Sequence, residues 1–219
     1  MSEFISEELE TILSPHYKLN RDKLEVTRVD CVQVTFEDFK ELAKTLPSSY
    51  KLELANNKIV IMPVGARTGQ KEALLIARVV AWCENNPNLV GLYGSSQTCY
   101  NLPLTNPIVR GPDASVVLAP RWNTLSANNQ AEAFPPVAPN FIVEICSDND
   151  SWNYCHNKML DYMNSGVDEG ILIDSINQTL TWYRTDTNGT NIVWSSQNNP
   201  HSFRSQILNG FTLDLHNII

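Results

Sequence analysis

Apolar and polar positions recur along the chain with spacings that predict three helices. Apolar residues follow helical spacing over residues 34–46, 70–85 and 151–164. Thr35 is a candidate N-cap for the first helix, and Asp38 three residues later makes a near capping box. The second segment is apolar around almost its whole circumference, which indicates a helix buried against a sheet.

Strand-like runs separate these helices. Residues 50–63 form two alternating apolar runs around Asn56-Asn57, which predicts a hairpin with asparagines in its turn. Further strands are predicted at residues 89–93, 97–102, 113–118, 141–146, 170–174 and 179–184. A polar, proline-bearing excursion over residues 121–140 is expected to be a surface loop or a short helix.

The order of these elements predicts the fold class. A strand at 141–146, a helix at 151–164 and a strand at 170–174 imply a right-handed parallel crossover. The other strands suit antiparallel pairing, so we expect a mixed α/β sheet in one domain over residues 33–219. Residues 1–32 are weakly patterned and are expected to form an arm or irregular lead-in.

Composition limits the expected location of the protein and the kinds of cysteine site that it could carry. The 219 residues contain no apolar run of about 18, so no membrane span is predicted. The acidic N-terminus lacks the basic and apolar regions of an export signal, which makes the cytoplasm the expected location. Five cysteines occur without a CxxC pair, which favours reduced, mostly buried thiols over a zinc site or disulfides.

The formal net charge of −8 counts against a nucleic-acid ligand. Proteins that grip duplex DNA usually carry a basic face, because neutralising phosphates supplies much of the affinity. Two explanations stay open. The acidic groups are concentrated at a metal site and elsewhere, leaving a local basic groove, or the affinity for nucleic acid is weak or absent.

Glu144 is the most anomalous charge in the sequence. It is the single carboxylate in the apolar run Asn140-Phe-Ile-Val-Glu144-Ile-Cys-Ser. Burying an unpaired charge is costly, so this group must be protonated, paired or bound to a metal. A metal ligand and a structural ion pair explain it equally well.

Asp113 and Lys158 are the other candidates for chemistry. Asp113 follows Pro112 at the start of an apolar strand, although Pro-Asp by itself more often marks a turn or a strand start. Lys158 lies in the helix that follows the Glu144 strand, with Tyr154 and Tyr162 on the same face at i−4 and i+4. A solvated lysine paired with Asp161 is the competing interpretation.

Together the three groups suit phosphodiester hydrolysis. Two carboxylates on adjacent strands can hold Mg²⁺ or Mn²⁺ and leave positions for water and a phosphate. Such an ion stabilises charge on phosphoryl oxygens and helps to form hydroxide. A nearby lysine can orient or deprotonate the attacking water, or neutralise developing negative charge.

These motifs resemble the PD-(D/E)xK nuclease superfamily, and more narrowly the Uma-two-type family of restriction endonucleases, once described as a domain of unknown function. Its opening glutamate hairpin is similar to KLELANNKIVIMP, its Pro-Asp strand to GPDASVV and its glutamate strand to FIVEICS. Its Lys-x-x-x-Tyr helix with the following strand is similar to KMLDYMNSGVDEGILID. The likeness extends from about Val34 to Leu215.

The resemblance implies a restriction endonuclease-like fold, a central mixed sheet flanked by helices, and a metal site. It implies Asp113 and Glu144 as ligands of Mg²⁺ or Mn²⁺ and Lys158 as the catalytic lysine. Additional candidates are Glu53 in the hairpin, Glu72 near the start of the second helix, and Tyr162. An exposed strand glutamate explains Glu53 equally well, and favourable placement near a helix N-terminus explains Glu72. Cys146 stands where the general superfamily pattern has its lysine.

Two functions therefore remain. The first is a metal-dependent endonuclease acting on nucleic acid, with DNA favoured over RNA and a homodimer expected by analogy at the level of the fold. The alternative is a catalytically silent member that keeps the fold as a binding or assembly module. The negative charge and Cys146 favour the silent module, whereas an intact set of Asp113, Glu144 and Lys158 favours the enzyme.

Overall fold

The fold was analysed in a computed structural model of the chain. The structure describes residues 9–10, 13, 15–30, 32–46, 50–62, 66–147 and 150–219. For residues 66–68 it describes the backbone alone. The chain divides into two compact units. The first draws on Met1–Val64 and Leu104–Arg110, and the second on Gly65–Pro103 and Gly111–Ile219.

The described part of the first unit contains an antiparallel sheet and the helix α2. Its strands pair in the order β1-β2-β4-β3-β7. Its elements are β1 (Tyr17–Asn20), β2 (Glu25–Arg28), α2 (Phe36–Thr45), β3 (Lys51–Ala55), β4 (Lys58–Met62) and β7 (Ile108–Arg110). The strand β7 was not foreseen, since three residues are too short to show an alternation.

Local chemistry explains α2 and the β3–β4 hairpin, and both predictions are confirmed. The Thr35 side chain accepts from the backbone of Asp38 and the Asp38 side chain accepts from Thr35, which completes a capping box. Asn56 and Asn57 both have positive φ, 51° and 62°, as a two-residue type I′ turn requires.

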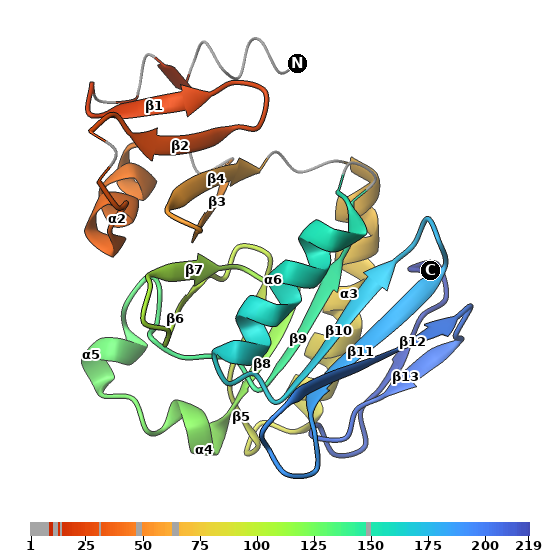
Figure 1. Cartoon of the computed structure of the whole chain (residues 1–219). Coiled ribbons are helices and arrows are strands. Elements are labelled where there is room, and N and C mark those ends of the chain that lie inside the picture. Colours follow the sequence, from red (N-terminus) through yellow and green to blue (C-terminus); the bar gives the residue numbers. More distant parts are fainter. Residues whose placement is uncertain are drawn as a thin grey trace. The chain divides into compact units, whose positions relative to one another are not determined.

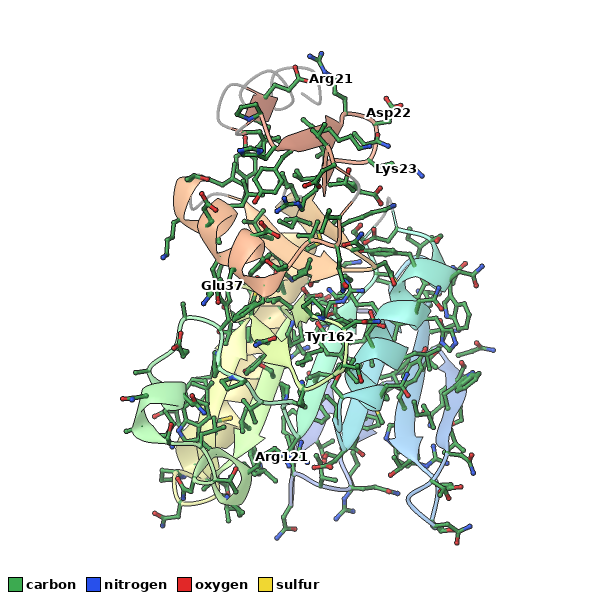
Figure 2. The ribbon with its side chains drawn as sticks, turned by 60° about the vertical axis from the view of Figure 1, so that its left-hand side comes forward. Arg21, Asp22, Lys23, Glu37, Arg121 and Tyr162 are labelled. Atoms are coloured by element: carbon green, nitrogen blue, oxygen red, sulfur yellow. The ribbon has the colours of Figure 1, made fainter. Side chains whose placement is uncertain are left out.

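The first two strands occupy part of the segment expected to be an arm or lead-in. The β1–β2 hairpin carries Arg21, Asp22 and Lys23 in its turn, where their side chains extend away from the strands (Figure 2). Each strand has only four residues and few apolar positions, so the sequence pattern was too weak to reveal it.

The second unit contains a six-stranded mixed sheet in the order β12-β11-β10-β9-β8-β5. Only β9 and β10 are parallel, and α6 connects them, so the predicted parallel crossover in an otherwise antiparallel sheet is confirmed. The elements of this unit are α3 (Ala66–Asn85), β5 (Val90–Ser95), β6 (Tyr100–Leu102), β8 (Ala114–Leu118), α4 (Ala119–Trp122), α5 (Ala127–Gln130), β9 (Phe141–Ile145), α6 (Trp152–Asn164), β10 (Glu169–Asp174), β11 (Thr179–Thr185), β12 (Ile192–Asn198), β13 (Ser202–Arg204) and β14 (Thr212–Asp214).

The two faces of this sheet pack against different helices (Figure 1). Phe141, Val143 and Ile145 of β9 join the main apolar core with α3 and the C-terminal segment. Residues alternate across a strand, so Ile142 and Glu144 face the other side, where α6 packs. Gly170 permits close approach there, because an added Cβ would lie 2.6 Å from Cε of Met159 in α6.

The predictions for the 121–140 excursion and for the cysteines agree in outline with the structure. The excursion over residues 121–140 contains the end of α4 and the single turn α5. The four cysteines that the structure describes are free and buried, as expected, while Cys31 lies outside the described residues. Within the described chain, no helix is both long and apolar enough to span a bilayer.

Candidate active site

Glu144 lies one residue before the end of β9, on the side of the sheet that α6 covers. All five residues of β9 are buried, and Glu144 is only 6% exposed. Its neighbours across the sheet are Leu172 on β10 and, on its other side, the start of β8. The sequence prediction that this carboxylate enters a buried strand is therefore confirmed.

Two side chains from α6 bind the Glu144 carboxylate. Lys158 Nζ lies 3.0 Å from Oε2 and 2.9 Å from Oε1, and the Tyr162 hydroxyl donates to Oε1 at 2.8 Å. Lys158 and Tyr162 are one helical turn apart, so both reach the same group. Lys158 is 5% exposed, so the interpretation of it as a solvated lysine is wrong. Tyr162 lies within the side chains around α6 (Figure 2).

The helix is held in place by local chemistry. Ser151 accepts a hydrogen bond from the backbone of Tyr154 and caps the N-terminus of α6. Ser165 is the C-cap, and Gly166 follows with a φ of 98°, which glycine adopts without steric cost. The two caps fix where α6 begins and ends, and therefore which of its side chains meet β9.

Asp113 reaches the same end of β9 from the neighbouring strand. It is 8% exposed, and its Oδ2 accepts a hydrogen bond from the backbone N–H of Ile145 at 2.8 Å. In the β8–β9 ladder Ala114 lies opposite Val143, so one further step places Asp113 opposite Glu144. Opposed residues of an antiparallel pair share a face. The fold thus brings Lys158 to Glu144 and Asp113 to the same end of β9.

The donor set suits a hard divalent cation. Asp113 and Glu144 offer carboxylate oxygens, and Mg²⁺ is commonly held by one or two carboxylates with water and phosphate in its other positions. Among the described residues no group of three or more histidine, cysteine, aspartate or glutamate side chains forms a metal cluster. Asp113 and Glu144 are a candidate pair of ligands, which would leave the other positions of an ion to water and substrate.

A family model described as "Putative restriction endonuclease", named Uma2, matches residues 36–216. The chain belongs to the Uma2 family. It also resembles a crystal structure described as a putative nuclease belonging to DUF820 from Anabaena variabilis, with a TM-score of 0.65 and 16% identity, over 84% of this chain and 97% of that one. At that identity the likeness concerns the fold. No curated protein matches the chain.

Within this Uma2 member, Cys146 stands two residues after Glu144 and packs near Cys155 of α6. A side-chain hydrogen bond with Cys146, together with burial, raises the pKa of the Cys155 thiol far above its ordinary value. Cys155 is thus a buried thiol packed against Cys146. Lys158 on the next helix contacts Glu144 at 3.0 Å, and its role as the catalytic lysine stays a prediction.

The two additional glutamates lie on β3 and α3. Glu53 lies on β3 in the first unit, fully buried, with Arg110 Nη1 at 2.8 Å from its Oε2. The interpretation of Glu53 as a solvent-facing strand residue is wrong. Glu72 lies in the early turns of α3, half-buried. Roles for either residue in metal or water binding stay predictions.

One group that positions Asp113 could not be found from the sequence. The Ile145 backbone N–H donates to the Asp113 carboxylate, and a backbone donor cannot be recognised from the identity of its residue.

Glu169, the other buried glutamate of this sheet, accepts from the Trp182 indole and from the Ser205 hydroxyl. It ties the C-terminal segment to β10 and provides a structural counterpart to Glu144.

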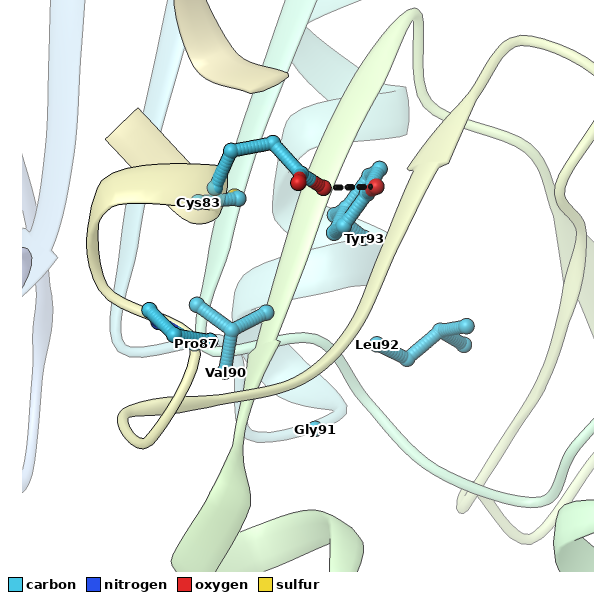
Figure 3. Close-up of a pocket in the computed structure, with 7 residues that line it drawn as sticks. Cys83, Pro87, Val90, Gly91, Leu92 and Tyr93 are labelled. Atoms are coloured by element: carbon cyan, nitrogen blue, oxygen red, sulfur yellow. Dashed lines mark hydrogen bonds between the residues drawn. The ribbon is translucent and has the colours of Figure 1, made fainter. Parts of the chain in front are cut away.

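A shallow hollow elsewhere in the second unit lacks this chemistry. It has a volume of about 270 Å³ and is lined by Cys83, Glu84, Pro87, Val90, Gly91, Leu92 and Tyr93 (Figure 3). The Tyr93 hydroxyl donates to Glu84 at 2.6 Å. Burial raises the pKa of the Cys83 thiol to about 12, so this cysteine is not a poised nucleophile.

Proposed function

We propose that this Uma2 member is a Mg²⁺- or Mn²⁺-dependent endonuclease that hydrolyses phosphodiester bonds of nucleic acid, with DNA as the favoured substrate. The observation that carries the proposal is the buried Glu144 carboxylate, bound by Lys158 and Tyr162, at the end of β9 that Asp113 also contacts through the Ile145 N–H. The family description supports nucleic acid as the substrate class.

In this proposal Asp113 and Glu144 hold the divalent ion. Bound there, the ion supplies positive charge for the phosphoryl oxygens and lowers the pKa of a coordinated water. The Ile145 N–H keeps Asp113 directed toward the end of β9. The Tyr162 hydroxyl orients Glu144 through Oε1 and prevents its rotation.

Lys158 has the second role. Its ammonium lies within 3.0 Å of Glu144, so it is already at the metal-binding carboxylate. From this position it can orient the attacking water or neutralise charge that develops on the phosphate. Its burial strengthens both effects, because electrostatic interactions are screened less in the protein interior than in water.

Cleavage of supercoiled plasmid DNA with Mg²⁺ or Mn²⁺ tests this proposal. We expect wild type to nick or linearise the plasmid, and Asp113→Ala, Glu144→Gln and Lys158→Met to lower the rate by at least about 100-fold. Glu169→Gln is the matched control, since it makes the same chemical change at a buried glutamate bound by Trp182 and Ser205. Equal rates for wild type and the three site variants would refute the proposal.

One observation favours the silent module. Lys158 and Tyr162 engage both oxygens of Glu144, as a purely structural ion pair would. In that case the site stabilises the fold without an ion, and the stability of the protein is insensitive to divalent metal. The enzyme and the module are therefore separated by metal binding, independently of any choice of DNA substrate.

A further inference from the structure

The β12 strand forms one edge of the six-stranded sheet (Figure 1). It pairs with β11 over all seven of its residues, from Ile192 opposite Thr185 to Asn198 opposite Thr179. Within the described part of the chain, β11 is the only strand that pairs with β12. Its outer row of backbone N–H and C=O groups is thus available to another strand.

This edge lacks the features that usually prevent pairing between proteins. Natural edge strands are commonly protected by lysine or other charged side chains, proline, a bulge or a very short length. β12 has the sequence IVWSSQN, without charge or proline, and its pairing with β11 is regular throughout. Its last five residues, from Trp194 to Asn198, are all exposed.

Charge points to the kind of partner. The whole chain carries a formal charge of −8, yet residues 187–203 contain no aspartate, glutamate, lysine or arginine. Two copies of a chain this acidic repel each other over most of their surfaces. A contact between copies is least opposed at a long uncharged segment, and here that segment coincides with the open edge.

Trp194 adds an ordered apolar group to the edge. Its ring stacks on Tyr183, with centroids 6.3 Å apart, and meets His156 edge-on at 4.9 Å. The His156 Nδ1 and the Tyr183 hydroxyl are 2.7 Å apart, which orders the supporting rings. Trp194 nevertheless remains 48% exposed. An aromatic ring that is already held in place loses little entropy when a partner covers it.

We propose that β12 pairs antiparallel with β12 of a second copy of this chain, forming a two-fold symmetric dimer with one sheet continuous across both copies. Full overlap of residues 192–198 places Ser195 opposite its own copy and Trp194 opposite Ser196. The two Trp194 rings then become diagonal neighbours, at a separation of about 7–8 Å between Cα atoms, within reach of aromatic side chains. Self-pairing of one surface is the arrangement that a two-fold axis requires.

Substitution at Ser195 tests both the dimer and its register. Light scattering after size exclusion should give wild type a mass near twice 24.7 kDa, about 49 kDa. Ser195→Lys and Ser195→Glu each place like charges opposite one another, so each variant alone should be monomeric. Mixing the two should restore the dimer, because lysine then faces glutamate. The matched control is Asn188→Lys, an exposed position in the β11–β12 turn, which should remain dimeric.

Each outcome decides the proposal. A 24.7 kDa wild type at all micromolar concentrations would overturn it, as would a Ser195→Lys variant that dimerises like wild type. Failure of the lysine and glutamate variants to combine would overturn the self-paired register. Circular dichroism of each variant shows that it is folded. The measurement needs neither metal nor DNA, so it stands or fails separately from the proposed nuclease activity.

Discussion

At the scale of single residues, the buried carboxylates of the second unit differ in what binds them. Glu169 accepts neutral N–H and O–H donors, whereas Glu144 is bound by an ammonium group and a phenol. A buried ion pair is weak evidence of added stability, because desolvation offsets most of the attraction. The Glu144–Lys158 pair is therefore not by itself evidence of a more stable fold.

Tyr162→Phe tests the positioning of Glu144. Loss of the hydroxyl removes a donor at 2.8 Å from the carboxylate, so we expect the free energy of unfolding to fall by about 1.5–3 kcal/mol. Hydrogen bonds to an ionised carboxylate lower its pKa. The acidic limb of the pH–rate profile for DNA cleavage should therefore move to higher pH in the variant.

Tyr183→Phe is the matched control for that profile. Its hydroxyl contacts His156 and not Glu144, so the variant should lose stability while the acidic limb stays in place. Identical pH profiles for wild type and Tyr162→Phe would contradict a positioning role for Tyr162.

At the scale of elements, the chemistry depends on how closely α6 packs on the sheet. Ile142 and Glu144 point toward α6 from β9, while Gly170 on β10 leaves room for Met159. Met159 is adjacent to Lys158 in the helix and fully buried. An apolar contact between α6 and β10 thus lies next to the Lys158–Glu144 pair.

Gly170→Val tests this dependence. Its Cβ would lie 2.6 Å from Met159 Cε and 3.2 Å from Ile142 Cγ1, so the end of the Met159 side chain must shift. We expect the free energy of unfolding to fall by about 1–3 kcal/mol, measured by urea denaturation. In the double variant with Met159→Ala the two losses should be less than additive. Additive losses, or a loss below about 0.5 kcal/mol for Gly170→Val, would contradict the packing argument.

At the scale of the whole molecule, the proposed metal site predicts that the stability of the protein responds to divalent ions. Removing two close carboxylates from water is offset when a cation binds them, and a ligand of the native state stabilises it by mass action. At a Mn²⁺ concentration about 100-fold above Kd, we expect the wild-type Tm to rise by roughly 5–10 °C.

The same thermal measurement on Glu144→Gln and Glu169→Gln supplies the comparison. Glu144→Gln should lose the response to Mn²⁺, while Glu169→Gln should keep it, and EDTA should reverse the rise. A wild-type Tm unchanged by Mn²⁺ would instead support the silent module.

Much of the fold could be predicted because its signals are local. The Thr35–Asp38 capping box and the Asn56-Asn57 turn are complete within four residues. The parallel crossover followed from a strand, helix and strand whose apolar spacings are distinct. By contrast, β1, β2 and β7 have four residues or fewer, so their existence depends on partners distant in the sequence.

For the candidate site, the sequence by itself determined that Glu144 is a charge in a buried strand, because apolar neighbours on both sides leave no exposed position for it. It could not determine what that charge meets, and left Lys158 open to a solvated interpretation. Only the tertiary structure decided that Lys158 and Tyr162 bind Glu144 and that Asp113 lies at the same end of β9. The physical reason is that these contacts depend on strand register and on helix packing, which join residues 14 or more positions apart.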